Sequence, residues 1–152
     1  METNGIATLW KKYNFLHEQL KVELGRTSNL TGEYAEYLIN AHLRGDLLKP
    51  STHSADIIVN DLFYQVKSRR TSKTLNTQLG IIRSWDFDFL AVVLFDNVGK
   101  VLKAMLYPKE TVLEYAKKNR LQNGWVLSMT RQVLDHKSGT DITQSLRKIN
   151  QD

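Results

Sequence analysis

Three polar side chains in the first half of the chain have residue types that bind metal ions and act on phosphates: Asp56, Gln65 and Lys67. A carboxylate and an amide oxygen are hard ligands of the kind that Mg²⁺ takes in proteins, where it usually keeps several waters. A lysine beside them can stabilise charge on a phosphate or help to deprotonate an attacking water. The same residues also fit a simpler interpretation: an exposed acid, a polar amide and a snorkelling lysine on an ordinary edge strand.

A predicted hairpin brings these three side chains together. Residues 55–59 and 62–68 are rich in β-branched and aromatic residues, which favours two strands joined by a turn at Asn60-Asp61. Side chains alternate across a strand and directly opposed residues share a face, so a pair between Asp56 and Gln65 places both beside Lys67. The apolar neighbours then occupy the opposite face: Ile57, Val59, Leu62, Tyr64 and Val66. A slip of one residue would separate Asp56 from Gln65.

Periodicity predicts the elements that surround this hairpin. Apolar residues at three- and four-residue spacings predict an amphipathic helix over 6–24, and a capping segment at 28–31 predicts a second helix over 31–44, ended by Gly45. A continuous apolar run predicts a buried strand at 89–95. The other predicted elements are a helix, or a loop with a short helix, at 71–85, a strand at 100–107, a helix at 109–119, a strand at 125–130 and a helix from Ile142. This order favours one α/β domain around a mixed sheet.

Composition narrows the class of protein. A chain of 152 residues with 41% hydrophobic and 24% charged residues suits a single globular domain. It contains no cysteine, which excludes disulfides, thiolate zinc sites and cysteine nucleophiles. We find no apolar run of the ~20 residues that a transmembrane helix needs and no signal-peptide pattern at the N-terminus. We therefore expect a cytoplasmic protein that does not enter a membrane.

Positive charge is concentrated near the hairpin. The net charge is +5, and no acid occurs between Asp61 and Asp86. Five basic residues lie in that interval: Lys67, Arg69, Arg70, Lys73 and Arg83. A local positive field suits a polyanionic partner, although a solvated basic face has the same composition.

Parts of this sequence resemble the PD-(D/E)XK nuclease superfamily, in its variant with glutamine in place of the second acid. The resemblance rests on the stretches 56–59 (DIIV) and 64–67 (YQVK), on 32–38 (GEYAEYL), which looks like the first core helix, and on 87–90 (FDFL). The chain is most similar to small bacterial members related to restriction and homing endonucleases. This implies a restriction-endonuclease-like core at 30–107, with a central mixed sheet flanked by helices. Residues 1–29 would form a helical extension, and 108–152 a C-terminal addition.

The resemblance implies roles for the residues of the hairpin. Asp56 would be the main ligand of Mg²⁺ or Mn²⁺, and Gln65 would take the place of the second acid. The carbonyl of Val66 would complete the metal shell, and Lys67 would be the catalytic lysine. Two departures from the family pattern occur: Ala55 stands where the family name has proline, and Gln65 removes one negative charge, which should weaken metal affinity.

Further roles fall outside the hairpin. Glu33 would supply the acid of the first core helix, with Glu36 one turn later as the alternative. Both also suit the start of a helix as plain surface acids, because the helix dipole favours them there. The residues expected to contact nucleic acid are His53, Arg69, Arg70, Lys73 and Arg83.

Three functions remain open from the sequence. The first is a metal-dependent endonuclease that hydrolyses phosphodiester bonds of double-stranded DNA, as a homodimer because cutting both strands needs two sites. The second is a catalytically weak or inactive protein of the same fold that binds nucleic acid or serves assembly, which Gln65 favours. The third, a globular interaction protein without a nucleic-acid role, requires a different hairpin register.

Overall fold

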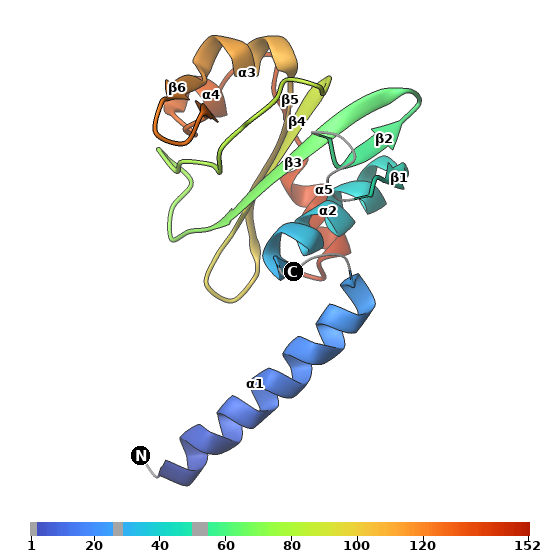
Figure 1. Ribbon diagram of the computed structural model, residues 1–152, viewed down its shortest axis with the longest axis vertical. Coiled ribbons are helices and arrows are strands. Elements are labelled where there is room, and N and C mark those ends of the chain that lie inside the picture. Colours follow the sequence, from blue (N-terminus) through green and yellow to red (C-terminus); the bar gives the residue numbers. More distant parts are fainter. Residues whose placement is uncertain (1–2, 26–28, 50–54) are drawn as a thin grey trace.

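The computed structural model describes residues 3–25, 29–49 and 55–152 and places them around one mixed β-sheet (Figure 1). In chain order the elements are α1 (Thr3–Leu24), α2 (Leu30–Leu43), β1 (Asp46–Leu47), β2 (Ile57–Val59), β3 (Leu62–Arg70), β4 (Phe89–Phe95), β5 (Val101–Pro108), α3 (Lys109–Tyr115), β6 (Lys117–Asn119), β7 (Gly124–Val126), α4 (Arg131–Leu134), β8 (Thr140–Asp141) and α5 (Thr143–Ile149). Six strands form the sheet in the order β1-β2-β3-β4-β5-β8, in which β3 and β4 run parallel and the other neighbours antiparallel. The expected α/β class with a mixed sheet is confirmed.

Both faces of the sheet are covered. The helices α2 and α5 pack on one face, which we call the α2 face; its buried cluster includes Ala35, Leu38, Ala91, Val93 and Leu146. The other face carries α3, α4 and the connection 71–88, which we call the strap. Its buried cluster includes Leu79, Ile82, Leu90, Val92, Val112 and Val133. The strand β4 is buried on both sides, as its continuous apolar sequence predicts.

The hairpin of β2 and β3 forms with the predicted turn. Its pairs run from Val59–Leu62 to Ile57–Tyr64. Asn60 and Asp61 both have positive φ, 49° and 66°, as a type I′ turn requires, and this turn matches the twist of the strands that it joins. The predicted apolar face is confirmed for four residues that belong to the cluster of the α2 face: Ile57, Val59, Tyr64 and Val66. Leu62, next to the turn, is exposed instead.

The predicted pair between Asp56 and Gln65 is wrong. The ladder ends at Ile57–Tyr64, and the main-chain N–H of Asp56 donates to the carbonyl of Tyr64, at 2.8 Å. Two successive residues of one strand therefore face a single residue of the other, as in a β-bulge. The alternation of faces also breaks here, since Ala55 packs in the cluster beneath the strap while Ile57 packs in that of the α2 face.

Residues 71–85 form no helix. The main chain of the strap instead bonds to the segment 124–129: Leu79 donates to the carbonyl of Leu127 at 3.0 Å, and Ile82 exchanges two bonds with Trp125. Backbone groups need partners, and a distant segment supplies them here in place of helical neighbours. Both predicted alternatives for this region, a helix or a loop followed by a short helix, are therefore wrong, because each contains a helix that does not form.

The C-terminal third also differs in detail from the prediction. The helix expected at 109–119 ends at Tyr115, because Ala116 is extended and 117–119 pair with β7. The strand expected at 125–130 is shorter, and the hydroxyl of Thr130 caps α4 by accepting from the N–H of Val133. Neither the short strands β1, β6 and β8 nor α4 was predicted. The terminal helix is present as α5.

Residues next to its two ends determine where α2 starts and stops. The side chain of Asn29 accepts a hydrogen bond from the N–H of Gly32, at 3.1 Å, so the predicted cap is confirmed. Arg44 ends the helix in the left-handed conformation. Glycine is needed at position 45 because a Cβ there would lie 2.6 Å from the carbonyl oxygen of Ile58.

Asp88 joins β3 to the start of β4, and its replacement should destabilise the fold. Its Oδ2 accepts from the N–H of Phe63 at 2.8 Å, so Asp88→Ala leaves a partly buried donor without a partner. We expect a loss of about 1–2 kcal/mol in the free energy of unfolding, measured by urea denaturation. The matched control is Asp86→Ala, because Asp86 is exposed and forms its hydrogen bonds with nearby Ser84. Equal losses in both variants would contradict the role of Asp88.

Candidate active site

The edge of β3 that faces β2 positions Asp56. Among the described residues, no strand pairs with this edge beyond Tyr64. The Asp56 carboxylate takes the place of the missing strand, since its Oδ2 accepts a hydrogen bond of 2.7 Å from the N–H of Val66. An unpaired backbone N–H away from water is costly, so this bond holds the carboxylate against β3.

Lys67 lies on the face of β3 beneath the strap. Its Nζ donates a hydrogen bond of 2.7 Å to the carbonyl oxygen of Ile81, a residue of the strap. Burial lowers the pKa of Lys67 below the ordinary lysine value of 10.5, the Asp56 carboxylate opposes that shift, and the Arg83 guanidinium adds to it. Lys67 therefore lies within electrostatic reach of one carboxylate and one guanidinium, and it loses its proton more readily than an exposed lysine.

Gln65 offers an oxygen without a partner. It lies two residues before Lys67 on β3, so both side chains point to the same face. Its Oε1 is buried and accepts no hydrogen bond. Within the described residues, the buried side-chain oxygens that lack partners belong to Glu33, Asn40 and Gln65. Such atoms are rare in folded proteins and point to a water or an ion that completes the site.

Glu33 lies on the other face of the sheet from Lys67. It is 5% exposed, and both of its carboxylate oxygens lack hydrogen-bond partners. The helix that carries it, α2, packs on the face that also holds Tyr64 and Val66. The structure therefore brings Asp56 and Lys67 together, with Gln65 on the same face of β3 as Lys67, and it leaves Glu33 on the opposite face of the sheet. Glu36, one turn later, is partly buried.

The predicted nucleic-acid contacts are divided between two regions. Arg83 and Arg69 lie in the same region as Lys67. Arg83 interacts electrostatically with Lys67, and Arg69 lies two residues further along β3. Arg70 points to the α2 face, where it lines a hollow next to α1. Lys73 is exposed in the strap. His53 lies outside the described residues.

The donor atoms at this site suit a hard divalent cation. Asp56 provides a carboxylate and Gln65 an uncommitted amide oxygen, and Mg²⁺ is commonly held by one or two carboxylates while it keeps its waters. No group of three or more His, Cys, Asp or Glu residues with metal-binding geometry occurs in the part of the chain that the structure describes. Asp56 and Gln65 would thus offer Mg²⁺ or Mn²⁺ one carboxylate and one amide oxygen.

Two parts of the site gave no signal in the sequence. The carbonyl of Ile81 holds Lys67, but a main-chain acceptor can come from any residue type. Asp88 fixes the neighbouring strand end through Phe63, and its role depends on a contact 25 positions away. The acid-free stretch 62–85 was the available clue to the strap, since it placed Arg83 in the same basic group as Lys67.

Comparisons with known proteins leave the family open. None of the known protein-family models matches the chain, and no curated protein matches it. Across residues 3–25, 29–49 and 55–152, every helix is too short or too polar to cross a membrane.

The pKa of Lys67 gives a test of this geometry. In NMR titrations of lysines labelled at Cε, we expect Lys67 to lose its proton at lower pH than the exposed lysines. Asp56→Asn should lower its pKa further, because the carboxylate favours the charged form, whereas Arg83→Gln should raise it. Lys137→Arg, an exposed position, serves as the control. A Lys67 signal that titrates with the exposed lysines, unchanged by Asp56→Asn, would contradict the site.

Proposed function

We propose that this protein is a metal-dependent DNA endonuclease with a restriction-endonuclease-like core. The observation that carries the proposal is the unpartnered Oε1 of Gln65, on the same strand face as a Lys67 that interacts with Asp56. A mixed sheet with helices on both faces supports the fold that the sequence resemblance implies. Fold alone does not establish activity, so the proposal rests on the site.

Each residue has a distinct task in the proposed reaction. Asp56 and Gln65 would hold Mg²⁺ or Mn²⁺, and the resemblance adds Glu33, whose carboxylate oxygens are buried without hydrogen-bond partners, as a further acid. When bound, such a cation supplies Lewis-acid stabilisation of the phosphate and a more acidic water. Lys67 would neutralise charge on the scissile phosphate or accept a proton from the attacking water. Its lowered pKa makes the neutral form more accessible, and the Ile81 carbonyl orients the amino group.

The charge around the site supports a nucleic-acid substrate. Arg69 and Arg83 extend the positive region from Lys67 along β3 and the strap. Arginine and lysine contacts to phosphates supply most of the non-specific affinity for DNA, and they make that affinity fall as salt rises. Arg83 donates to the carbonyl of Gln122 at 2.8 Å, which holds its guanidinium against the turn between β6 and β7.

Loss of either Asp56 or Lys67 should abolish cleavage. We expect purified protein to nick or cut supercoiled DNA in Mg²⁺ or Mn²⁺ but not in EDTA, and Asp56→Ala and Lys67→Ala to reduce the rate by at least about 100-fold. Lys137→Ala removes an exposed lysine from the connection between α4 and β8 and should keep full activity. Circular dichroism checks that each variant remains folded.

The outcomes separate the two main functions. Metal-dependent cleavage that persists in either site variant would overturn the assignment of these residues. If no DNA is cut but binding is intact and salt-sensitive, the alternative of a nucleic-acid-binding or assembly module is favoured. The neutral Gln65 and the absence of a three-acid cluster among the described residues are the observations behind that alternative.

Gln65→Glu should strengthen metal binding. The change adds a negative charge at the unpartnered oxygen with almost no change in shape, and the charge of the ligands sets the affinity of such sites. We expect the Mn²⁺ dissociation constant, measured by calorimetry without DNA, to fall about tenfold. Gln78→Glu, an exposed change in the strap, is the matched control and should leave it unchanged. Equal affinity in the wild type and Gln65→Glu would exclude Gln65 as a ligand.

A further inference from the structure

The helix α1 carries most of the exposed apolar surface of the described chain. Of fourteen large hydrophobic residues that are exposed, eight belong to this helix of 22 residues: Ile6, Leu9, Trp10, Tyr13, Phe15, Leu16, Leu20 and Val22. The helix extends away from the sheet, so its N-terminal half lies far from the rest of the chain (Figure 1). Exposed apolar surface of this extent on a soluble chain marks an interaction site.

Five of these residues form a stripe along the helix. Ile6, Leu9, Tyr13, Leu16 and Leu20 follow each other at alternating spacings of three and four residues. This is the spacing of the core positions where two helices pair side by side. Phe15 and Val22 are at least as exposed as the residues of the stripe, but they lie outside it. The pattern therefore points to another helix as the partner of α1.

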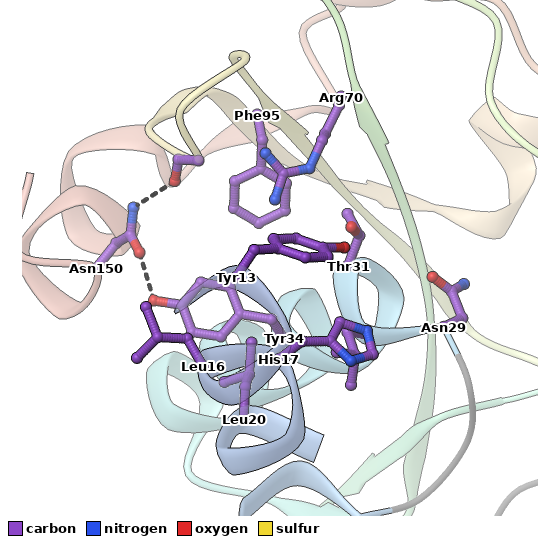
Figure 2. A pocket seen from close by; sticks show the side chains of 12 residues that line it. Tyr13, Leu16, His17, Leu20, Asn29, Thr31, Tyr34, Arg70, Phe95 and Asn150 are labelled. Atoms are coloured by element: carbon purple, nitrogen blue, oxygen red, sulfur yellow. Dashed lines mark hydrogen bonds between the residues drawn. The ribbon is translucent and has the colours of Figure 1, made fainter. Parts of the chain in front are cut away.

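A hollow of about 830 Å³ lies between the C-terminal half of α1 and the body of the protein. Figure 2 shows Tyr13, Leu16 and Leu20 on one side of it, with Tyr34, Phe95 and Arg70 around them. Asn150 closes one end by bonding to Tyr34 and to the carbonyl of Gly99. The C-terminal half of the stripe thus faces an unfilled space, while its N-terminal half protrudes.

We propose that α1 pairs antiparallel with α1 of a second copy of this chain, so that each protruding N-terminal half enters the hollow of the other copy. With a two-fold axis near residues 14–15, Leu9 faces Leu20 of the second copy, and Tyr13 faces Leu16. One surface then serves both copies, as a two-fold interface requires. The protrusion and the hollow belong to one chain, which makes the surface self-complementary.

The apolar area is sufficient for this pairing. Exposed aromatic and aliphatic side chains of these sizes contribute on the order of 100 Å² each, so the stripe and Trp10 offer about 600 Å² per copy before the walls of the hollow are counted. A standard interface buries about 800 Å² per partner. The walls of the hollow add little, because Phe95 is only 2% exposed, so two copies together would bury about 1,200 Å², the lower bound for specific interfaces.

The test is the mass of the full chain in solution. Light scattering during gel filtration should give twice the chain mass of 17.5 kDa for the wild type. Leu9→Lys combined with Leu16→Lys should give a monomer. The matched control, Phe15→Lys combined with Val22→Lys, places the same charges at equally exposed positions off the stripe and should remain a dimer. A monomeric wild type, or two variants that behave alike, would overturn the proposal.

The chain has no cysteine, so single cysteines report the orientation. A mixture of Leu9→Cys and a tagged Leu20→Cys should form the mixed disulfide on mild oxidation. Disulfides of Leu9→Cys with itself would indicate parallel helices and overturn the antiparallel arrangement. These readouts do not depend on cleavage, so this inference can fail while the proposed function holds, and the reverse.

Discussion

The site depends on one constraint, which is that the main-chain N–H of Val66 needs a hydrogen-bond acceptor. Beyond Tyr64 the described part of β2 no longer pairs with β3, yet the donor on this edge is partly buried and needs an acceptor. The Asp56 carboxylate supplies it, after a bulge that gives Tyr64 two partners on the opposing strand. A hydrogen bond that completes the sheet thereby brings the carboxylate within electrostatic reach of Lys67.

The need of backbone groups for hydrogen-bond partners also determines the path of the strap, on the other side of the site. The strap has no regular structure of its own, so its N–H and C=O groups bond to the segment 124–129. Its apolar residues Leu79 and Ile82 enter the core over Leu90 and Val92. Anchored in this way, it presents one carbonyl to Lys67 and holds Arg83 nearby. The strap covers Lys67 because its backbone groups form hydrogen bonds with the segment 124–129. The resulting burial lowers the pKa of Lys67.

Local patterns were sufficient to predict the regular elements of this fold. The apolar run of β4, the Asn60-Asp61 turn and the Asn29 cap of α2 each depend on residues within a few positions of one another. Prediction failed where the partner is distant: in the strap, in the early end of α3 and in the two-residue strands. Their backbone bonds are made to segments that no local pattern identifies.

For the site, the sequence by itself determined that Gln65 and Lys67 share a strand face, because alternation is a property of any strand. It also brought Asp56 near them by way of a pairing that does not form. Only the tertiary structure decided that Asp56 reaches this region through a bulge and the N–H of Val66, that Glu33 belongs to the opposite face, and that Ile81 holds Lys67. These outcomes depend on how sheet, strap and α2 pack, and packing joins residues whose separation along the chain carries no periodic signal.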